Sequence, residues 1–246
     1  MNNISFNIKK LMPLSAGLAS DADWLCWAEN DHKWLTPSAA VAHDLIPPMA
    51  RRRMSTLSKI AVQSAIAISL EQEIDYIIFS SRHGELTRTV QLLQDILAGE
   101  DASPTAFSQS VHNTAAGLYT ILTKQAIPVS SLSAGENTFP SALIEASSYL
   151  AQNPSHQVLV VDFDQPVPDV YHQFTNENFE GYAVAMLLTQ GDNYQLSWTA
   201  RSDAQVQYPL PHALDFVSHF HRNSTQWSVE SQRNQWIWRV TGRESN

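Results

Sequence analysis

The segment at residues 127–139, with the sequence IPVSSLSAGENTF, constrains the fold more than any other part of the chain. It reads as a short apolar strand, a turn of small residues and the start of a helix. Many α/β enzymes place a nucleophile at such a turn, because the tight bend exposes one side chain beside free backbone N–H groups. Here Glu136 stands at the expected helix start, and the only cysteine is Cys26, far away in the chain. The segment therefore predicts either an active site or the shape of one without its nucleophile.

Short apolar runs and amphipathic runs alternate along most of the chain, separated by proline and glycine. We predict helices at 51–70, 86–97, 111–124 and 139–152, and strands at 4–8, 76–79, 129–132, 157–163, 184–188 and 236–240. Residues 11–48 contain several prolines and are expected to be irregular. The alternation of strands and helices predicts an α/β fold around a mostly parallel sheet.

The composition bounds the class of protein. With 246 residues, 43% hydrophobic and 16% charged, the chain can bury a substantial core. A net charge of -9 argues against general binding of nucleic acid, which needs a basic surface. One cysteine excludes an internal disulfide and a cysteine-based zinc site. The chain starts without a signal-peptide pattern and has no apolar run of about 18 residues, so we expect a cytoplasmic protein without a membrane span.

The turn offers a serine as an alternative nucleophile. Residues 131–135, SLSAG, resemble half of the G-x-S-x-G elbow of α/β-hydrolases, with Ser133 as nucleophile. Asp162 or Asp164 follows a predicted strand and His212 comes later, which gives the order Ser, Asp, His of those enzymes. The first glycine of the motif is a serine here. The competing interpretation is that these serines only cap backbone groups of a turn, and that Glu136 interacts favourably with the helix dipole.

Two pairs of polar residues suggest other chemistry. His112 and Asn113 lie near the start of the predicted helix at 111–124 and either act as acid and base or simply begin the helix. His219 and His221 would share one side of a strand as metal ligands, but on a helix they point about 200° apart. Since no carboxylate or thiol stands in ligand register with them, we predict no metal site.

Arg51, Arg52 and Arg53 form the only basic run. They stand where the helix at 51–70 is expected to begin, and the helix dipole slightly disfavours cations there. This misfit suggests an anionic partner, whereas the alternative interpretation is a solvated surface.

Residues 103–117, SPTAFSQSVHNTAAG, resemble the S-P-x-x-F-x-x-S-V-H-N-x-x-x-G segment of β-ketoacyl synthases, whose fold is called thiolase-like. The order of the predicted elements also fits the N-terminal half of that family, over about residues 1–190. The resemblance implies the N-terminal half of a thiolase-like fold, with a mostly parallel five-stranded sheet and helices. Residues 191–246 would then be a C-terminal appendage that packs on the same domain.

The resemblance assigns a meaning to Glu136. Ketosynthases place their cysteine at the start of the helix whose body resembles residues 141–146, SALIEA, and counting back puts that position at Glu136. Chain-length factors, the noncatalytic partners of ketosynthases in type II polyketide systems, also lack this cysteine. The two active-site histidines of the family lie in its C-terminal half, so His212, His219 and His221 do not take their roles. We therefore expect a short chain-length-factor-like subunit with no catalytic residue, of the kind found in aryl polyene systems.

The family implies the partners and the site. A catalytic ketosynthase would form a heterodimer with this chain, and would supply the cysteine and histidines that elongate polyene, polyketide or fatty acid chains. Phosphopantetheine would arrive on an acyl carrier protein that docks mainly on the partner, so this chain needs no cofactor of its own. The alternative role is a scaffold that only stabilises the partner. The candidates for the acyl tunnel or interface are Phe107, His112, Asn113, Tyr119, Glu136 and Phe139, and those for carrier docking are Arg51, Arg52 and Arg53.

The helix at 139–152 gives a physical reason for a partner. It is apolar nearly all round, with Glu145 as its only charge, so it should be covered on most sides. In the complete family fold the second half covers it. If roughly 800 Å² of apolar surface stayed exposed to water, the chain would forgo about 20 kcal/mol of favourable burial free energy, at about 25 cal/mol/Å². We therefore expect an obligate partner at this helix.

Overall fold

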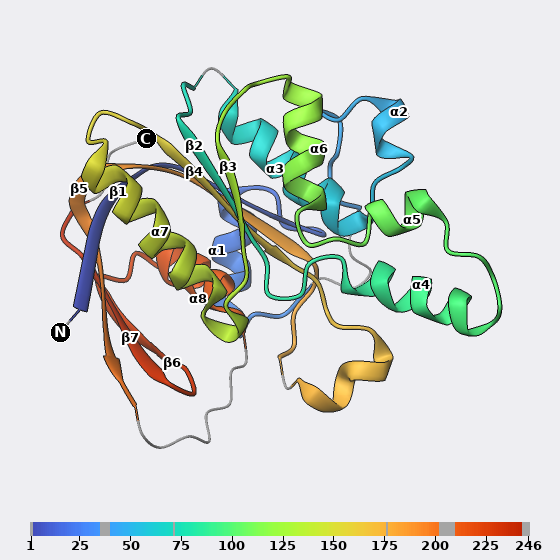
Figure 1. Cartoon of the computed structure of the whole chain (residues 1–246). Helices are drawn as coiled ribbons and strands as arrows, with labels where there is room; N and C mark the ends of the chain where they lie inside the picture. The colour runs from blue at the N-terminus through green and yellow to red at the C-terminus, as the bar shows by residue number, and fades with distance from the viewer. Residues whose placement is uncertain (1, 35–39, 71, 176, 202–209, 243–246) are drawn as a thin grey trace.

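The structure is a computed structural model that describes residues 2–34, 40–70, 72–175, 177–201 and 210–242. A central sheet carries helices on both faces (Figure 1). The strands are β1 (Asn2–Ser15), β2 (Tyr76–Ser80), β3 (Val129–Leu132), β4 (Val158–Asp164), β5 (Tyr182–Ala200), β6 (Gln226–Glu230) and β7 (Asn234–Val240). The helices are α1 (Asp21–Glu29), α2 (Pro48–Arg51), α3 (Thr56–Ser69), α4 (Leu86–Leu97), α5 (Pro104–Ser108), α6 (Thr114–Thr123), α7 (Thr138–Gln152) and α8 (His212–His221), with 3-10 turns η1 (Gly135–Asn137) and η2 (Asp169–Phe174).

The described strands form one mixed sheet of seven strands, in the order β3-β2-β4-β5-β7-β6, with β1 also pairing with β5. β2 runs parallel to β3 and β4, whereas β5 runs antiparallel to β1, β4 and β7, and β6 runs antiparallel to β7. The α/β class is confirmed, but the predicted mostly parallel sheet of five strands is wrong. Parallel pairing is limited to β2, β3 and β4, because β5 runs antiparallel to β4 and the remaining strands, β1, β6 and β7, pair only in antiparallel fashion.

The N-terminal region is more regular than the sequence indicates. β1 continues to Ser15 through Pro13, because in the described sheet β5 is its single neighbour and a proline is tolerated on such an edge. Helix α1 follows, in the stretch expected to be irregular. Its capping box joins Ser20 and Asp23, and this pair was a sequence signal for a helix start.

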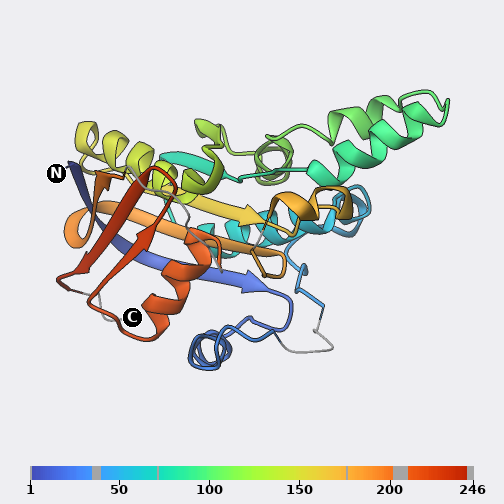
Figure 2. The same cartoon turned by 90° about the horizontal axis from the view of Figure 1, so that it is seen from below.

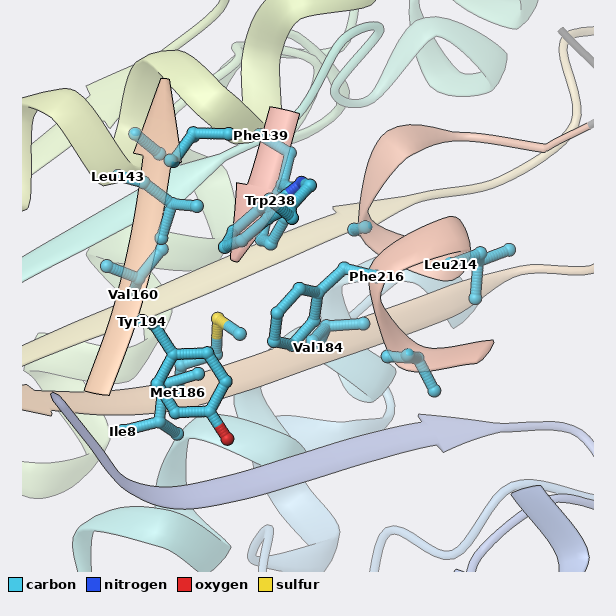
Figure 3. Close-up of a cluster of buried hydrophobic side chains, with 14 of the residues drawn as sticks. Ile8, Phe139, Leu143, Val160, Val184, Met186, Tyr194, Leu214, Phe216 and Trp238 are labelled. Atoms are coloured by element: carbon cyan, nitrogen blue, oxygen red, sulfur yellow. The ribbon is translucent and has the colours of Figure 1, made fainter. Parts of the chain in front are cut away.

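Alternate residues of the buried strands face the two helical layers. In β4, Val158 and Val160 point to the side of α7 and α8, while Leu159 and Val161 point to the side of α3 and α6. Figure 3 shows the first of these clusters, in which Val160, Val184 and Met186 from the sheet lie close to residues of α7, α8 and β7. The residues on both faces of β4 are buried, as expected for a strand at the centre of a layered fold.

The chain itself covers the apolar side of α7. Phe139 is 3% exposed, and its ring centroid lies 5.8 Å from that of Phe216 in α8 and 6.4 Å from that of Trp238 in β7. Ala142, Leu143, Ala146 and Leu150 of the same helix are also buried. The predicted bare surface on this helix is therefore wrong, because the residues after 210 fold over it (Figure 3).

The expected boundary between residues 190 and 191 falls inside β5, which crosses it without a break. The elements that follow, β6 and β7, continue the same sheet. The division of the chain into a family domain and an appendage stays a prediction.

Helices α4 and α5 project from the rest of the molecule, and we call residues 86–108 the α4–α5 arm. Figure 2 shows it extending away from the body of the molecule. Within α4 only Leu92 is buried. Leu93, Ile96 and Leu97 are 51%, 46% and 86% exposed, and Phe107 in α5 is 63% exposed. These side chains form an apolar surface of the kind that marks an interaction site.

Over the ranges that the structure describes, none of the helices is both long and apolar enough to cross a membrane.

Replacing Phe216 by alanine tests whether the C-terminal elements hold α7. Phe216 is fully buried between Phe139 and Trp238, so Phe216→Ala should lower the free energy of unfolding by about 3–5 kcal/mol in urea titrations. Phe174→Ala is the matched control, since Phe174 is 73% exposed and its loss should change stability by less than about 0.5 kcal/mol. Equal effects of the two substitutions would contradict the packing described.

Candidate functional site

The elbow that the sequence predicts is present between β3 and α7. Gly135 has a φ of +61°, a left-handed conformation that glycine adopts without strain. The Thr138 hydroxyl donates to the Gly135 carbonyl at 2.6 Å and accepts from the Ala134 N–H at 3.0 Å, which closes the turn. The turn is therefore held by backbone and hydroxyl groups.

A small polar cavity lies beside the elbow, at the carboxyl ends of β2 and β4. Its volume is about 20 Å³, enough for a single water molecule. Arg82 and His83 follow β2, Asp162 and Asp164 end β4, and His212 begins α8. The start of α8 thus lines the small cavity beside the elbow, while Ser133, Ala134 and Gly135 of the turn itself are exposed.

Two buried carboxyls form the floor of the cavity. Asp162 accepts hydrogen bonds from the hydroxyls of Ser80 at 2.7 Å and Tyr182 at 2.9 Å. Burial, and then repulsion from Asp164, raise the pKa of Asp162 to about 7. Burial also raises the pKa of Asp164 to about 6, although the Arg82 N–H at 2.7 Å opposes the rise. Near neutral pH Asp162 therefore keeps a share of its proton that a free carboxyl would have lost.

The wall of the cavity holds an ion pair and two imidazoles. Arg82 Nη1 lies 3.0 Å from the Glu177 carboxylate. Burial lowers the pKa of both His83 and His212 to about 4, and the Arg82 cation adds to the effect. Both imidazoles are consequently neutral at pH 7, so Arg82 provides the fixed positive charge of the wall.

Three elbow residues contact the C-terminal hairpin formed by β6 and β7. Glu136 Oε1 accepts the backbone N–H of Gln232 at 2.7 Å. Asn137 Oδ1 accepts the indole N–H of Trp236 at 2.9 Å. Phe139 packs on Trp238, as described above. The first turn of α7 is therefore joined to the tail by polar and apolar contacts.

The structure places the remaining tunnel candidates in different surroundings. Phe107 is exposed on the α4–α5 arm, and Asn113 is exposed at the start of α6. His112 is half-buried, with Nε2 2.8 Å from the Ser81 carbonyl oxygen. Tyr119 is fully buried against Phe79 in the core beneath α6. Of these four residues, none lines the cavity beside Glu136, and Phe107 and Asn113 are the most exposed.

The arginine run lies differently from the sequence prediction. Helix α3 begins at Thr56 with Ser55 as its cap, and α2 ends at Arg51. Arg51 is thus in the last turn of α2, where a cation is favourable, and the argument from a dipole misfit is wrong. Arg52 and Arg53 are exposed in the following turn.

The residues proposed for a serine hydrolase do not form a triad. The Ser133 hydroxyl donates to the Arg82 carbonyl at 3.1 Å. Asp164 is occupied by the Ser81 hydroxyl and by the backbone N–H groups of Arg82 and His83. Among the described residues no imidazole hydrogen-bonds to the Ser133 hydroxyl, so the serine–histidine contact that activates such a nucleophile is not formed.

The C-terminal histidines lie on helix α8, which separates them. His219 stacks on Trp227 with ring centroids 4.7 Å apart, and His221 Nδ1 lies 2.9 Å from the Val217 carbonyl oxygen. Among the residues that the structure describes, no group of three or more His, Cys, Asp or Glu side chains could hold a metal ion.

Sequence reasoning missed most of the cavity. Ser80, Ser81 and Arg82 follow a predicted apolar strand, and polar residues at a strand end are a signal that was available. Glu177 and Tyr182 gave no such signal, because only the fold brings them to Arg82 and Asp162.

The layered fold and the elbow between β3 and α7 are those of a ketosynthase-like protein, and the elbow of this chain contains no cysteine. The family described as "Beta-ketoacyl synthase, N-terminal domain" matches residues 24–239. The chain belongs to this family. Among curated proteins, no sequence matches it significantly.

Solved structures agree with this assignment. The structure described as "Ketosynthase (ApeO) in Complex with its Chain Length Factor (ApeC) from Xenorhabdus doucetiae" contains a chain that is 32% identical, with a TM-score of 0.85. The match covers 96% of this chain and 99% of that chain, so the two are of nearly the same length.

Two more distant structures share the fold. The ishigamide ketosynthase/chain length factor matches with a TM-score of 0.61 and 12% identity, over 81% of this chain and 68% of that chain. A β-ketoacyl synthase from Burkholderia phymatum STM815 matches with a TM-score of 0.56 and 11% identity, over 80% of this chain and 64% of that chain. The predicted resemblance is confirmed: the chain is chain-length-factor-like and has the N-terminal half of a thiolase-like fold.

Replacing Asp162 by asparagine tests the protonated floor of the cavity. Because the pKa of Asp162 rises from 3.8 to about 7, the native protein holds a proton that the unfolded chain loses, and this contribution to stability falls as the pH rises between those values. Asparagine mimics the protonated carboxyl and does not titrate. Asp162→Asn should therefore gain stability relative to the wild type as the pH rises from about 4 to about 7, in urea titrations.

His83 and His212 contribute with the opposite sign, but equally in both proteins, so they cancel in the difference. Asp101→Asn is the control, since Asp101 is an exposed carboxyl. A constant difference between Asp162→Asn and the wild type across this range would show that Asp162 does not hold the proton.

Proposed function

We propose that this chain is a noncatalytic, chain-length-factor-like subunit that pairs with a catalytic β-ketoacyl synthase. The observation that carries the proposal is the elbow between β3 and α7, which contains no cysteine. In the proposed alignment Glu136 stands where ketosynthases present their cysteine, and the cavity beside it has space for about one water molecule. The end-to-end similarity to a chain of a ketosynthase–chain length factor complex supports the same role.

In the proposed complex the partner performs the chemistry. Its cysteine receives the acyl chain, and its histidines assist the condensation with a malonyl unit delivered on phosphopantetheine by an acyl carrier protein. This chain completes the acyl tunnel and limits the length of the product. We extend the proposal to an aryl polyene type of polyketide or fatty acid system, on the resemblance stated in the sequence analysis. We expect the complex to act in the cytoplasm.

The surface that suits the partner is the apolar face of the α4–α5 arm together with η2. Leu97 and Phe107 on the arm and Phe174 on η2 are 86%, 63% and 73% exposed. A hydrogen bond of 2.7 Å from Gln165 to Thr87 joins the segment before η2 to the base of the arm. Since the apolar side of α7 is covered by the chain itself, we place the partner on these exposed apolar side chains.

Carrier docking is proposed at Arg51, Arg52 and Arg53, next to the arm. Arg88 in α4 donates through Nη2 to the Arg53 carbonyl at 3.1 Å, so the basic turn and the arm lie side by side. An acidic carrier protein would be repelled by a chain of charge -9 except at such a local patch. The carrier should therefore make most of its contacts with the partner and reach this turn only at the edge.

A charged residue on the arm should break the heterodimer. Leu97→Glu places a carboxylate in the proposed apolar contact and should reduce co-purification with the ketosynthase by tenfold or more, because burying an unpaired charge costs well over about 1.4 kcal/mol. Leu70→Glu is the control: Leu70 is 52% exposed and lies after α3, at the end of the sheet opposite to the arm. Normal co-purification of Leu97→Glu would place the partner elsewhere.

Phe107→Ala tests whether the chain influences product length. Phe107 is exposed in this chain, so its replacement by alanine should not disturb the fold. Tyr119 and Phe139 are buried, so replacing either of them would lower the stability of the chain and obscure any effect on product length. If Phe107 limits the tunnel, the reconstituted complex should make longer acyl chains, as measured by mass spectrometry of carrier-bound products. Unchanged product length with a normal yield of complex would favour the scaffold role.

A further inference from the structure

We propose that Glu136 and Asn137 form an intramolecular latch that holds the C-terminal hairpin, residues 226–240, against the start of α7. The residue at the position of the lost cysteine would then be a positioning residue for the tail. This role goes beyond the pairing with a ketosynthase, because it operates within the single chain and requires no partner.

The turn of the hairpin is built to present one N–H to Glu136. Ser231 and Asn234 close the turn, with the Ser231 N–H donating to the Asn234 carbonyl at 2.7 Å and the Asn234 N–H donating to the Ser231 hydroxyl at 3.1 Å. The Gln232 N–H is left outside this pairing and donates to Glu136 Oε1 at 2.7 Å. The geometry therefore gives the carboxylate a specific donor at the tip of the hairpin.

A second contact fixes the hairpin along its length. Trp236 is 3% exposed, and its indole N–H donates to Asn137 Oδ1 at 2.9 Å. Two residues further along β7, Trp238 stacks with Phe139 at an interplanar angle of 28°. The elbow residues 136, 137 and 139 thus meet the hairpin at three points, which sets both its distance and its register on α7.

A second carboxylate, that of Glu177, lies near Glu136 beside the cavity. The Glu136 carboxylate lies close enough to Glu177 to raise the pKa of that residue, behind the larger effect of burial. Such repulsion disfavours a second carboxylate beside the cavity. The start of α7 and the Gln232 N–H offset it, since a hydrogen bond to an ionised acceptor is stronger than one to a neutral acceptor.

The same contacts separate Glu136 from acid–base chemistry. Its Oε1 faces the hairpin turn, and the neighbouring cavity has room for about one water molecule and no substrate. The hairpin in turn helps to bury Phe139, through Trp238. The latch therefore keeps the tail in the position that the second half of the family fold would otherwise occupy over the elbow helix.

Hydrogen exchange of the full-length protein tests the latch. Glu136→Ala should speed the exchange of amides at residues 226–240 by roughly tenfold, the change that about 1.4 kcal/mol of lost hydrogen bonding gives. Glu136→Gln keeps an oxygen acceptor and should retain part of the protection. Asn137→Ala should speed exchange in the same segment.

Ser133→Ala is the matched control, because Ser133 belongs to the same elbow and bonds to the Arg82 carbonyl instead of the hairpin. It should leave residues 226–240 as protected as in the wild type. Two outcomes would overturn the proposal: unchanged exchange of the hairpin in Glu136→Ala, or an increase that is equally large in β4 and α3, which would indicate general destabilisation. The exchange is measured with and without the ketosynthase. Exchange of the hairpin in the isolated chain tests the latch alone, whereas an unchanged exchange pattern on adding the ketosynthase would count against the proposed pairing.

Discussion

The packing of the elbow helix against the tail is the interaction on which the rest of this structure depends. Helix α7 carries a row of apolar side chains that the sheet alone does not cover, and in a complete thiolase-like fold the second half would lie over it. Here Phe216 and Trp238 enclose Phe139, so one chain supplies both the elbow and its cover. Roughly 2–3 kcal/mol of burial for each large side chain makes this arrangement strongly favourable.

The elbow of this chain is tied to its own C-terminal hairpin. Glu136 accepts an N–H from the hairpin turn, and the adjacent cavity holds about one water molecule. In the proposed alignment, Glu136 stands where a ketosynthase presents its thiol. Exposed apolar surface lies instead on the α4–α5 arm, where Leu97 is 86% exposed. The elbow and the proposed pairing surface are thus different parts of the molecule, which suits the proposed role of a subunit that completes a ketosynthase.

Much of the fold followed from the sequence, and the reasons for the failures are physical. The first and last residues of α4 and β3 were predicted correctly. In each element the local sequence pattern that indicates it stops clearly at its ends. The cover of α7 was missed because it depends on contacts between Phe139 and residues about 80 and 100 positions later, which no local pattern reveals. For the site, the turn and Glu136 were found from local sequence. Tyr182, Glu177 and Gln232 were not, since only the folded chain brings them to the elbow.

The central claim is that this chain takes part in condensation without carrying the acyl group. Intact mass spectrometry of both subunits, after the complex is incubated with acyl-loaded carrier protein, tests it directly. The account predicts an acyl adduct on the ketosynthase subunit and an unmodified mass for this chain at every time point. An acyl adduct on this chain, at Ser133, Glu136 or any other residue, would contradict it.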